Sequence, residues 1–169
     1  IRDPADCRGL TIRTQIAEDI VEAFRLIGFE PKPIDIKLAV EELTAGRIDA
    51  QENPLTSINA FSIQKLHKYI TLTGHVFGVA LLLCNAERHA SLPAEVRAAL
   101  DAAAAEATRA QRAMAVEQDV SLIGAFEAQG VEFVHLTGAE RQAFADAVAP
   151  LTARLTAGID PELLKRLRG

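Results

Sequence analysis

Apolar residues along the chain alternate between short β-prone runs and stretches with helical spacing. Leu10–Thr14 is the first β-prone run, and apolar residues then recur every three or four positions from Ile16 until Gly28. Further strands are predicted at 31–34, 69–73 and 131–135, one begins at Ile48, and helices are predicted at 38–45, 55–65 and 139–157, with a short one from Pro161. This alternation predicts α/β units with a mostly parallel sheet.

The longest uninterrupted apolar run is Val76–Cys84. It is about half the length that a membrane-spanning helix needs. Its composition is that of a strand covered on both faces, so we expect a buried strand here.

Residues 93–129 have a helical apolar stripe, no proline after Pro93, and Gly130 as a stop signal. About 37 residues at 1.5 Å each would span about 55 Å. A compact domain of this chain's size is only about 40 Å across. The helix therefore either breaks, at Gly124, or runs as a beam between two lobes, and we favour the beam.

Composition and charge exclude several classes of protein. The chain has 169 residues, 49% of them apolar, and a net charge of −5 with no basic block. These values fit one ordinary domain and give no electrostatic footprint for nucleic acid or anionic lipid. No targeting segment is visible and the first residue is isoleucine, so we expect the chain to begin inside a longer product or after processing.

Templates for metal binding and catalysis are not found. Cys7 and Cys84 lie far apart and the four histidines form no HxxxH pair, so we expect no structural metal. There is also no GxSxG elbow and no glycine-rich phosphate loop, and we predict no cofactor. Asp49 and Glu52 are the carboxylates that an enzyme on this fold would use as a base.

Candidate binding residues follow two of the predicted strands. Arg13 ends the first strand, and the carboxyl ends of strands are where open α/β sheets bind ligands. A guanidinium there can hold a carboxylate with two hydrogen bonds, although such an arginine is also compatible with a solvated surface residue. Gln51 and Asn53 follow the third strand and could face the same crevice. The alternative for Asn53 is the N-cap of the next helix.

Several consecutive segments resemble one family. They are Asp6–Arg13 (DCRGLTIR), Leu43–Leu55 (LTAGRIDAQENPL), Lys68–His75 (KYITLTGH) and Ser91–Arg97 (SLPAEVR). In order and spacing they are similar to the DctP-type solute receptors of TRAP (tripartite ATP-independent periplasmic) transporters. The resemblance covers essentially the whole chain, but only about the C-terminal half of such a receptor.

The resemblance implies an α/β, periplasmic-binding-protein-like (type II-like) fold with two lobes that close around a small organic acid. Residues 1–73 and 130–169 would form the second lobe, 74–92 would cross to the incomplete first lobe, and 93–129 would be the helix that connects the lobes. It also implies a periplasmic location, delivery of the ligand to a membrane permease, and no chemistry on the ligand.

The resemblance also assigns roles to individual residues. Arg13 matches the arginine that forms a salt bridge with the ligand carboxylate, and Asn53 matches a polar ligand contact, with Gln51 as a further one. His75 lies where the chain crosses between lobes and is expected to be structural. Ile36 stands where many members place a pocket aromatic, and Ile16 stands where sialic-acid receptors carry asparagine. These departures favour a smaller mono- or dicarboxylate.

Two other functions are compatible with the same residues. One is an extracytoplasmic sensor domain of the same fold, and the other is a small α/β enzyme that anchors a carboxylate substrate through Arg13. We also expect that a chain without most of its first lobe exposes apolar surface and strand edges, which predicts self-association or exchange of segments.

Overall fold

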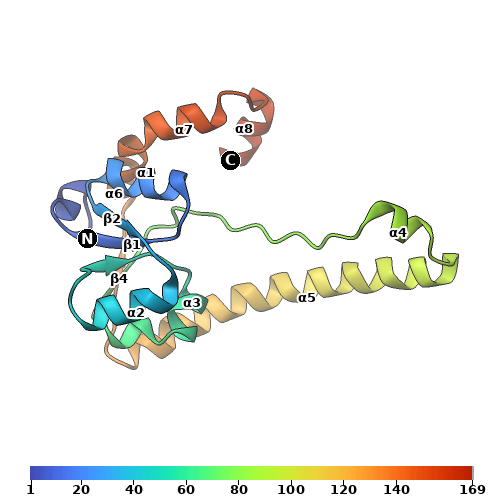
Figure 1. Ribbon diagram of the computed structural model, residues 1–169, viewed down its shortest axis with the longest axis horizontal. Coiled ribbons are helices and arrows are strands. Elements are labelled where there is room, and N and C mark those ends of the chain that lie inside the picture. The colour runs from blue at the N-terminus through green and yellow to red at the C-terminus, as the bar shows by residue number, and fades with distance from the viewer. Residues whose placement is uncertain (169) are drawn as a thin grey trace.

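The computed structural model describes residues 1–168 and shows α/β units with one long projecting helix (Figure 1). The elements in chain order are η1 (Pro4–Cys7), β1 (Thr11–Thr14), α1 (Glu18–Ile27), β2 (Glu30–Pro33), α2 (Ile36–Thr44), β3 (Ala50–Gln51), α3 (Leu55–Ala60), η2 (Ile63–Lys65), β4 (Tyr69–Leu72), α4 (Ala86–Ala90), α5 (Ala94–Glu127), β5 (Glu132–His135), α6 (Gly138–Ala147), α7 (Ala149–Thr156) and α8 (Pro161–Arg168).

The strands form two small parallel sheets. The first has the order β2-β1-β3, with β1 in the centre, and the second pairs β4 with β5. All three strand pairings are parallel, as the alternation of strands and helices predicts. In the first sheet Arg13 lies opposite Lys32 of β2 on one side and Gln51 of β3 on the other.

Each sheet has its own hydrophobic core. Near the first sheet, the buried side chains of Cys7, Ile12, Phe24 and Phe29 form one cluster. The second cluster joins α2, α3 and η2 to the C-terminal end of α5, and its buried members are Leu43, Ile48, Ile58, Ile63, Phe126 and Val131. The two clusters are separate, which leaves space between the two sheets.

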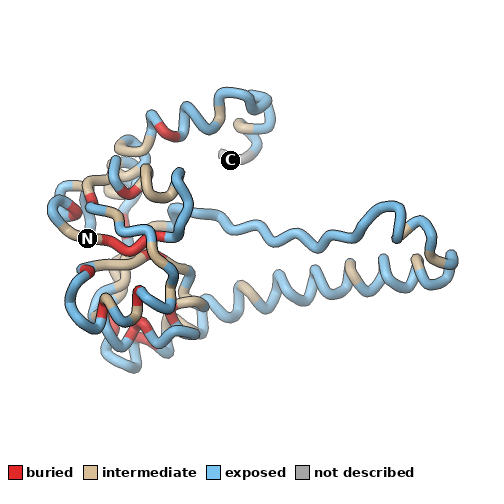
Figure 2. The backbone as a smooth tube through the Cα atoms, viewed as in Figure 1, coloured by how far each residue is buried: buried red, intermediate tan, exposed pale blue. Residues whose placement is uncertain are grey.

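The long helix is confirmed as one uninterrupted element. α5 has 34 residues and continues through Gly124 without a break, so it is about 50 Å long. Only its C-terminal end is packed on the body, where Phe126 is fully buried, and the rest projects outward with α4 at its far end (Figure 1). Most of the projecting part is exposed (Figure 2).

The prediction of a buried strand at Val76–Cys84 is wrong. This segment contains no strand, and its side chains are exposed, with Phe77 at 91% and Leu83 at 80% (Figure 2). The segment leaves the body and extends in the same general direction as the projecting helix, and nothing in the described part of the chain pairs with its backbone as a strand (Figure 1). Apolar composition alone cannot bury a strand without a neighbouring sheet to receive it.

Two predicted helices are divided. The helix expected at 55–65 ends at Ala60, because Ser62 adopts a left-handed conformation (φ 55°) before η2 begins. The helix expected at 139–157 is split between α6 and α7 beside Pro150. Proline has no backbone N–H and its ring clashes with the preceding turn, so a continuous helix is unfavourable there.

Candidate functional site

Arg13 is a buried arginine at the carboxyl end of the central strand. Its residue is only 4% exposed, and its Nε donates a hydrogen bond to the carbonyl oxygen of Ile34 at 2.9 Å. That bond fixes the guanidinium beside the end of β2, while Nη1 is buried and has no hydrogen-bond partner among the described residues. A buried N–H group without an acceptor is costly, and a ligand oxygen would relieve that cost.

The electrostatic surroundings of Arg13 are mixed. Burial lowers the pKa of the Arg13 guanidinium, and the nearby carboxylates of Glu52 and Asp35 oppose that shift. Arginine keeps its charge in proteins, so the site holds a desolvated cation. Such a cation is a strong anchor for a carboxylate, because a charge-assisted pair gains strength in a low-dielectric environment.

Gln51, Glu52 and Asn53 extend from the end of β3 into a turn before α3. Asn53 Nδ2 donates to Gln51 Oε1 at 2.6 Å, which leaves the Asn53 oxygen and the Gln51 amide nitrogen available for another partner. Gln51 pairs in register with Arg13, so their side chains lie on the same face of the sheet. Asn53 does not cap α3, whose N-cap position is Pro54.

His75 connects this turn to the point where the chain leaves the body. Its Nδ1 lies 2.7 Å from Thr73 Oγ1, and its Nε2 lies 3.5 Å from Glu52 Oε2. The ring also makes an edge-to-face contact with Phe24, with 5.4 Å between the ring centroids. These contacts hold the chain against α1 and β3 just before residues 76–84 begin.

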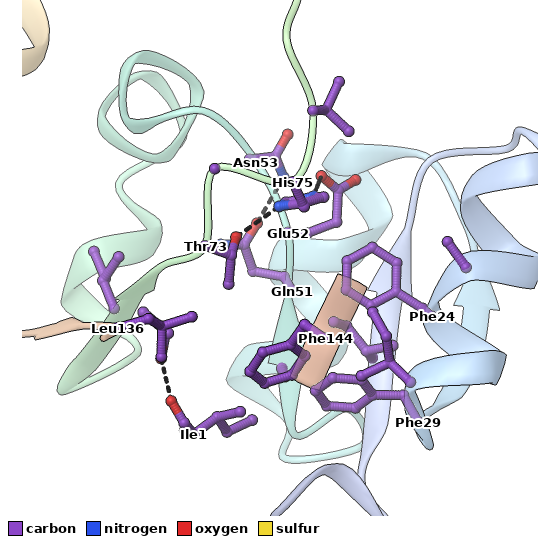
Figure 3. A pocket seen from close by; sticks show the side chains of 18 of the residues that line it. Ile1, Phe24, Phe29, Gln51, Glu52, Asn53, Thr73, His75, Leu136 and Phe144 are labelled. Atoms are coloured by element: carbon purple, nitrogen blue, oxygen red, sulfur yellow. Dashed lines mark hydrogen bonds and ion pairs between the residues drawn. The ribbon is translucent and has the colours of Figure 1, made fainter. Parts of the chain in front are cut away.

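A cavity of about 1100 Å³ lies between the two sheets. Figure 3 shows the polar group of Gln51, Glu52, Asn53, Thr73 and His75 at one end, and two apolar walls beyond it. One wall carries the aromatic rings Phe24, Phe29 and Phe144, and the other carries Ile1 and Leu136.

The structure places the predicted site residues in three different surroundings. Gln51 and Asn53 line the cavity, whereas Arg13 lies beside it without lining it. Ile36, the first residue of α2, packs against the core cluster of Phe126 instead. Arg13 and Gln51 are therefore neighbours, and Ile36 is separated from the cavity.

Glu52 is a site residue that sequence reasoning missed as a binding group. The sequence suggested it only as the base of an enzyme, but it is 9% exposed and its Oε1 is buried with no hydrogen-bond partner among residues 1–168. The sequence feature that could have identified it is its position between Gln51 and Asn53, at the end of a strand. Burial of a carboxylate cannot be seen from that position alone.

The described residues contain neither a metal-binding group nor a helix suited to span a membrane. Within residues 1–168 no group of His, Cys, Asp and Glu side chains is arranged to hold a metal ion. No helix in the same range is both long and apolar enough to span a membrane.

Comparison with known proteins identifies the class. Residues 1–158 match the family model DctP, bacterial extracellular solute-binding protein, family 7. The chain is 31% identical to the 2,3-diketo-L-gulonate-binding periplasmic protein YiaO of Escherichia coli over 88% of its own length and 44% of the relative's. It is 25% identical to the C4-dicarboxylate-binding periplasmic protein DctP of Rhodobacter capsulatus, over 98% of the chain and 50% of that protein.

Solved structures agree with this class. A TRAP periplasmic solute-binding protein from Bordetella, with density assigned to pantoate, superimposes with a TM-score of 0.79 at 34% identity, covering 99% of this chain and 55% of that one. One from Ralstonia eutropha with bound (S)-2-acetolactate gives a TM-score of 0.80 at 27% identity, covering 98% and 55%. These proteins have a two-lobed, periplasmic-binding-protein-like fold.

The fold and the comparisons thus place the chain among the bacterial solute-binding proteins, whose solved relatives include TRAP periplasmic solute-binding proteins. The chain belongs to the DctP family, bacterial extracellular solute-binding protein family 7. It spans about half the length of the relatives and structures that it matches.

Proposed function

We propose that this chain is the ligand-anchoring half of a periplasmic TRAP-transporter receptor that captures a small mono- or dicarboxylate. Arg13 forms a salt bridge with the ligand carboxylate, and Asn53 and Gln51 orient the ligand by hydrogen bonds. The observation that carries the proposal is the buried guanidinium of Arg13, which is fixed through Nε but has no partner at Nη1.

The proposed division of the chain follows from the same assignment. Residues 1–73 and 130–169 form the second lobe, although residue 169 lies outside the described range. Residues 74–92 cross to the first lobe, 93–129 connect the lobes, and Ile36 contributes an aliphatic contact near the ligand once the lobes have closed. The unbroken α5 and the contacts that hold His75 at the start of the crossing support this division.

The proposed mechanism is capture followed by closure. The ligand carboxylate pairs with Arg13, closure of the first lobe removes water, and each charge-assisted hydrogen bond strengthens as the surroundings lose polarity. The closed receptor then delivers the acid to the membrane permease without altering it. Hinge motion falls at the segment that follows His75, because that segment leaves the packed body.

Calorimetric titration of a receptor polypeptide that contains this chain and a first lobe tests the proposal. A panel of pantoate, (S)-2-acetolactate and succinate is titrated into the unmodified protein and into Arg13→Ala. Removing the arginine leaves the ligand charge unpaired in a closed cleft, which costs about 3 to 5 kcal/mol, so affinity falls by about 100-fold or more.

The matched control is Arg25→Ala, which removes an exposed arginine from α1. It should leave affinity unchanged. Equal affinity of the unmodified protein and the Arg13→Ala variant for every acid that binds would disprove the role of Arg13.

A further inference from the structure

Residues 73–75, here called the crossing point, lie where the chain leaves the packed body (Figure 1). β4 ends at Leu72, just before the crossing point, and residues 76–84 beyond it contain neither strand nor helix. Hinges between lobes are a few residues at the ends of elements that absorb a change in backbone dihedral angles. The contacts that hold the crossing point therefore decide where such a hinge begins.

Three elements contact the crossing point. Glu52 Oε2, after β3, lies 3.5 Å from His75 Nε2, and Phe24 of α1 packs edge-to-face against the imidazole ring. Figure 3 shows both residues beside His75, whose Nδ1 lies 2.7 Å from Thr73 Oγ1. The third element is α6, from which Arg141 Nη1 donates a hydrogen bond to the backbone carbonyl of Thr73 at 2.9 Å. Of these contacts, only the one from Arg141 is made to the backbone.

Arg141 extends from a helix turn that is itself fixed. Thr137 and Glu140 form a capping box at the start of α6, in which the Glu140 carboxylate accepts from the Thr137 N–H at 2.7 Å. Arg2 donates to Glu140 and to the carbonyl oxygen of His135, which ties this turn to the end of β5. Arg141 follows Glu140 directly, so its backbone is positioned before its side chain reaches the crossing point.

Gly74 at the centre of the crossing point leaves room for the guanidinium. It adopts φ 59°, a conformation that residues with a Cβ rarely adopt. A Cβ built on Gly74 would lie 3.2 Å from Arg141 Nη1, which is closer than an ordinary van der Waals contact. Any larger residue at this position would strain the backbone and displace the guanidinium from Thr73.

We propose that Arg141 is a positioning residue that sets where the hinge of the receptor begins. By holding the Thr73 carbonyl it keeps the body rigid up to the crossing point, so the change in dihedral angles on closure falls after His75. A hinge confined in this way has fewer open arrangements, and less conformational entropy is lost when the lobes close on a ligand. This role rests on the proposed closure of two lobes, but it needs no contact between Arg141 and the ligand.

Calorimetric titration of the polypeptide that contains this chain and a first lobe tests the role through Arg141→Met. Methionine keeps the apolar stem of the side chain but has no N–H donor. Affinity for every acid of the panel that binds should fall by the same factor, about threefold to tenfold, because the longer hinge has more freedom to lose. The preference for an acid over its primary amide should stay unchanged, since the carboxylate still meets Arg13.

The matched control is Arg25→Met, which removes an exposed arginine from α1 and should change neither the affinity nor the preference. Unchanged affinity in Arg141→Met, while Arg13→Ala still weakens binding, would overturn the role of Arg141 and leave the proposed function intact. Loss of the preference for the acid in Arg141→Met would also overturn it, because it would show that Arg141 contacts the ligand carboxylate.

Relaxation of backbone ¹⁵N nuclei in the 169-residue chain gives a measurement that needs no ligand. The Gly74 amide should be as rigid as the amides of β4, with an order parameter near about 0.85, and should fall towards about 0.6 in Arg141→Met. Gly74→Ala should loosen the Thr73 and His75 amides in the same way, and combining it with Arg141→Met should be less than additive, because both changes remove one contact.

A Gly74 amide that stays rigid in Arg141→Met would overturn the proposal whatever the ligand does. If Arg13→Ala instead left the affinity for every acid unchanged, the proposed function would fail, and the order parameter of Gly74 would still decide whether Arg141 fixes the crossing point.

Discussion

At the scale of single residues, the site depends on one arginine that is positioned before any ligand arrives. The bond from Arg13 Nε to the Ile34 carbonyl fixes the guanidinium plane, so little side-chain entropy is lost on binding. The register with Gln51 then places an amide on the same face of the sheet. A lysine at this position would keep the charge. Its single ammonium group could not donate to the Ile34 carbonyl and also present a planar pair of N–H groups to a carboxylate.

Cys7 gives a test of burial near the same sheet. It is fully buried, and burial together with the neighbouring charge of Asp6 raises the pKa of its thiol to about 11. At pH 8 only about one folded molecule in a thousand carries the thiolate at Cys7, which is the reactive form. Alkylation with iodoacetamide, followed by mass spectrometry, should therefore modify the exposed Cys84 and spare Cys7.

The control for this experiment is the chain in guanidinium chloride, where both thiols should react.

The raised pKa of the Cys7 thiol also predicts how stability changes with pH. The unfolded thiol ionises near pH 9 while the folded thiol stays protonated, so the free energy of unfolding should fall as pH rises from about 9 towards 11. Equal labelling of the two cysteines in the native chain would contradict this account of Cys7.

At the scale of elements, local signals predicted most of the fold. Gly28 and Gly46 both adopt positive φ, at 120° and 67°, where the sequence predicts the ends of α1 and α2. The strand-helix alternation predicted the parallel pairing, and the helical apolar stripe with no proline between Pro93 and Gln129 predicted α5. These elements are determined by signals within their own segments, so they can be predicted from the sequence.

What the sequence could not predict depends on distant partners. Residues 76–84 have the composition of a buried strand, yet whether they are buried depends on a sheet that residues 1–168 do not supply. The separation of Ile36 from the cavity likewise follows from how α2 packs against the Phe126 cluster. Pro150 is a sequence signal for the split between α6 and α7. The apolar residues keep helical spacing on both sides of it, so the spacing alone predicted one continuous helix.

Phe126 is the buried residue by which the C-terminal end of α5 packs on the body. Phe126 is fully buried and stacks on Phe133, with 6.5 Å between ring centroids and 3° between ring planes. Phe126→Ala should lower the free energy of unfolding by about 3 to 5 kcal/mol, because it leaves a cavity in the cluster that joins α5 to α3. Urea unfolding followed by circular dichroism measures the change.

The matched substitution on the same helix is Val116→Ala, at an exposed position in the projecting part. Its effect should stay within about 0.5 kcal/mol. A comparable loss in both variants would mean that the projecting part of α5 contributes as much to stability as its packed end, contrary to the structure.

At the scale of the whole molecule, the chain combines a packed body with two exposed projecting segments. The body holds Arg13, Gln51 and Asn53 near the carboxyl ends of β1 and β3, while α5 and residues 76–84 extend away from it (Figure 1). This asymmetry fits a chain that spans about half the length of its two-lobed relatives.

The central claim, that Arg13 binds the ligand through its carboxylate, is tested most directly by a thermodynamic cycle. The acid of the panel that binds best and its primary amide are each titrated calorimetrically into the two-lobed receptor and into its Arg13→Ala variant. We predict that the unmodified protein prefers the acid by about 100-fold or more and that Arg13→Ala abolishes this preference. A preference for the acid that persists unchanged in Arg13→Ala would show that another group binds the carboxylate.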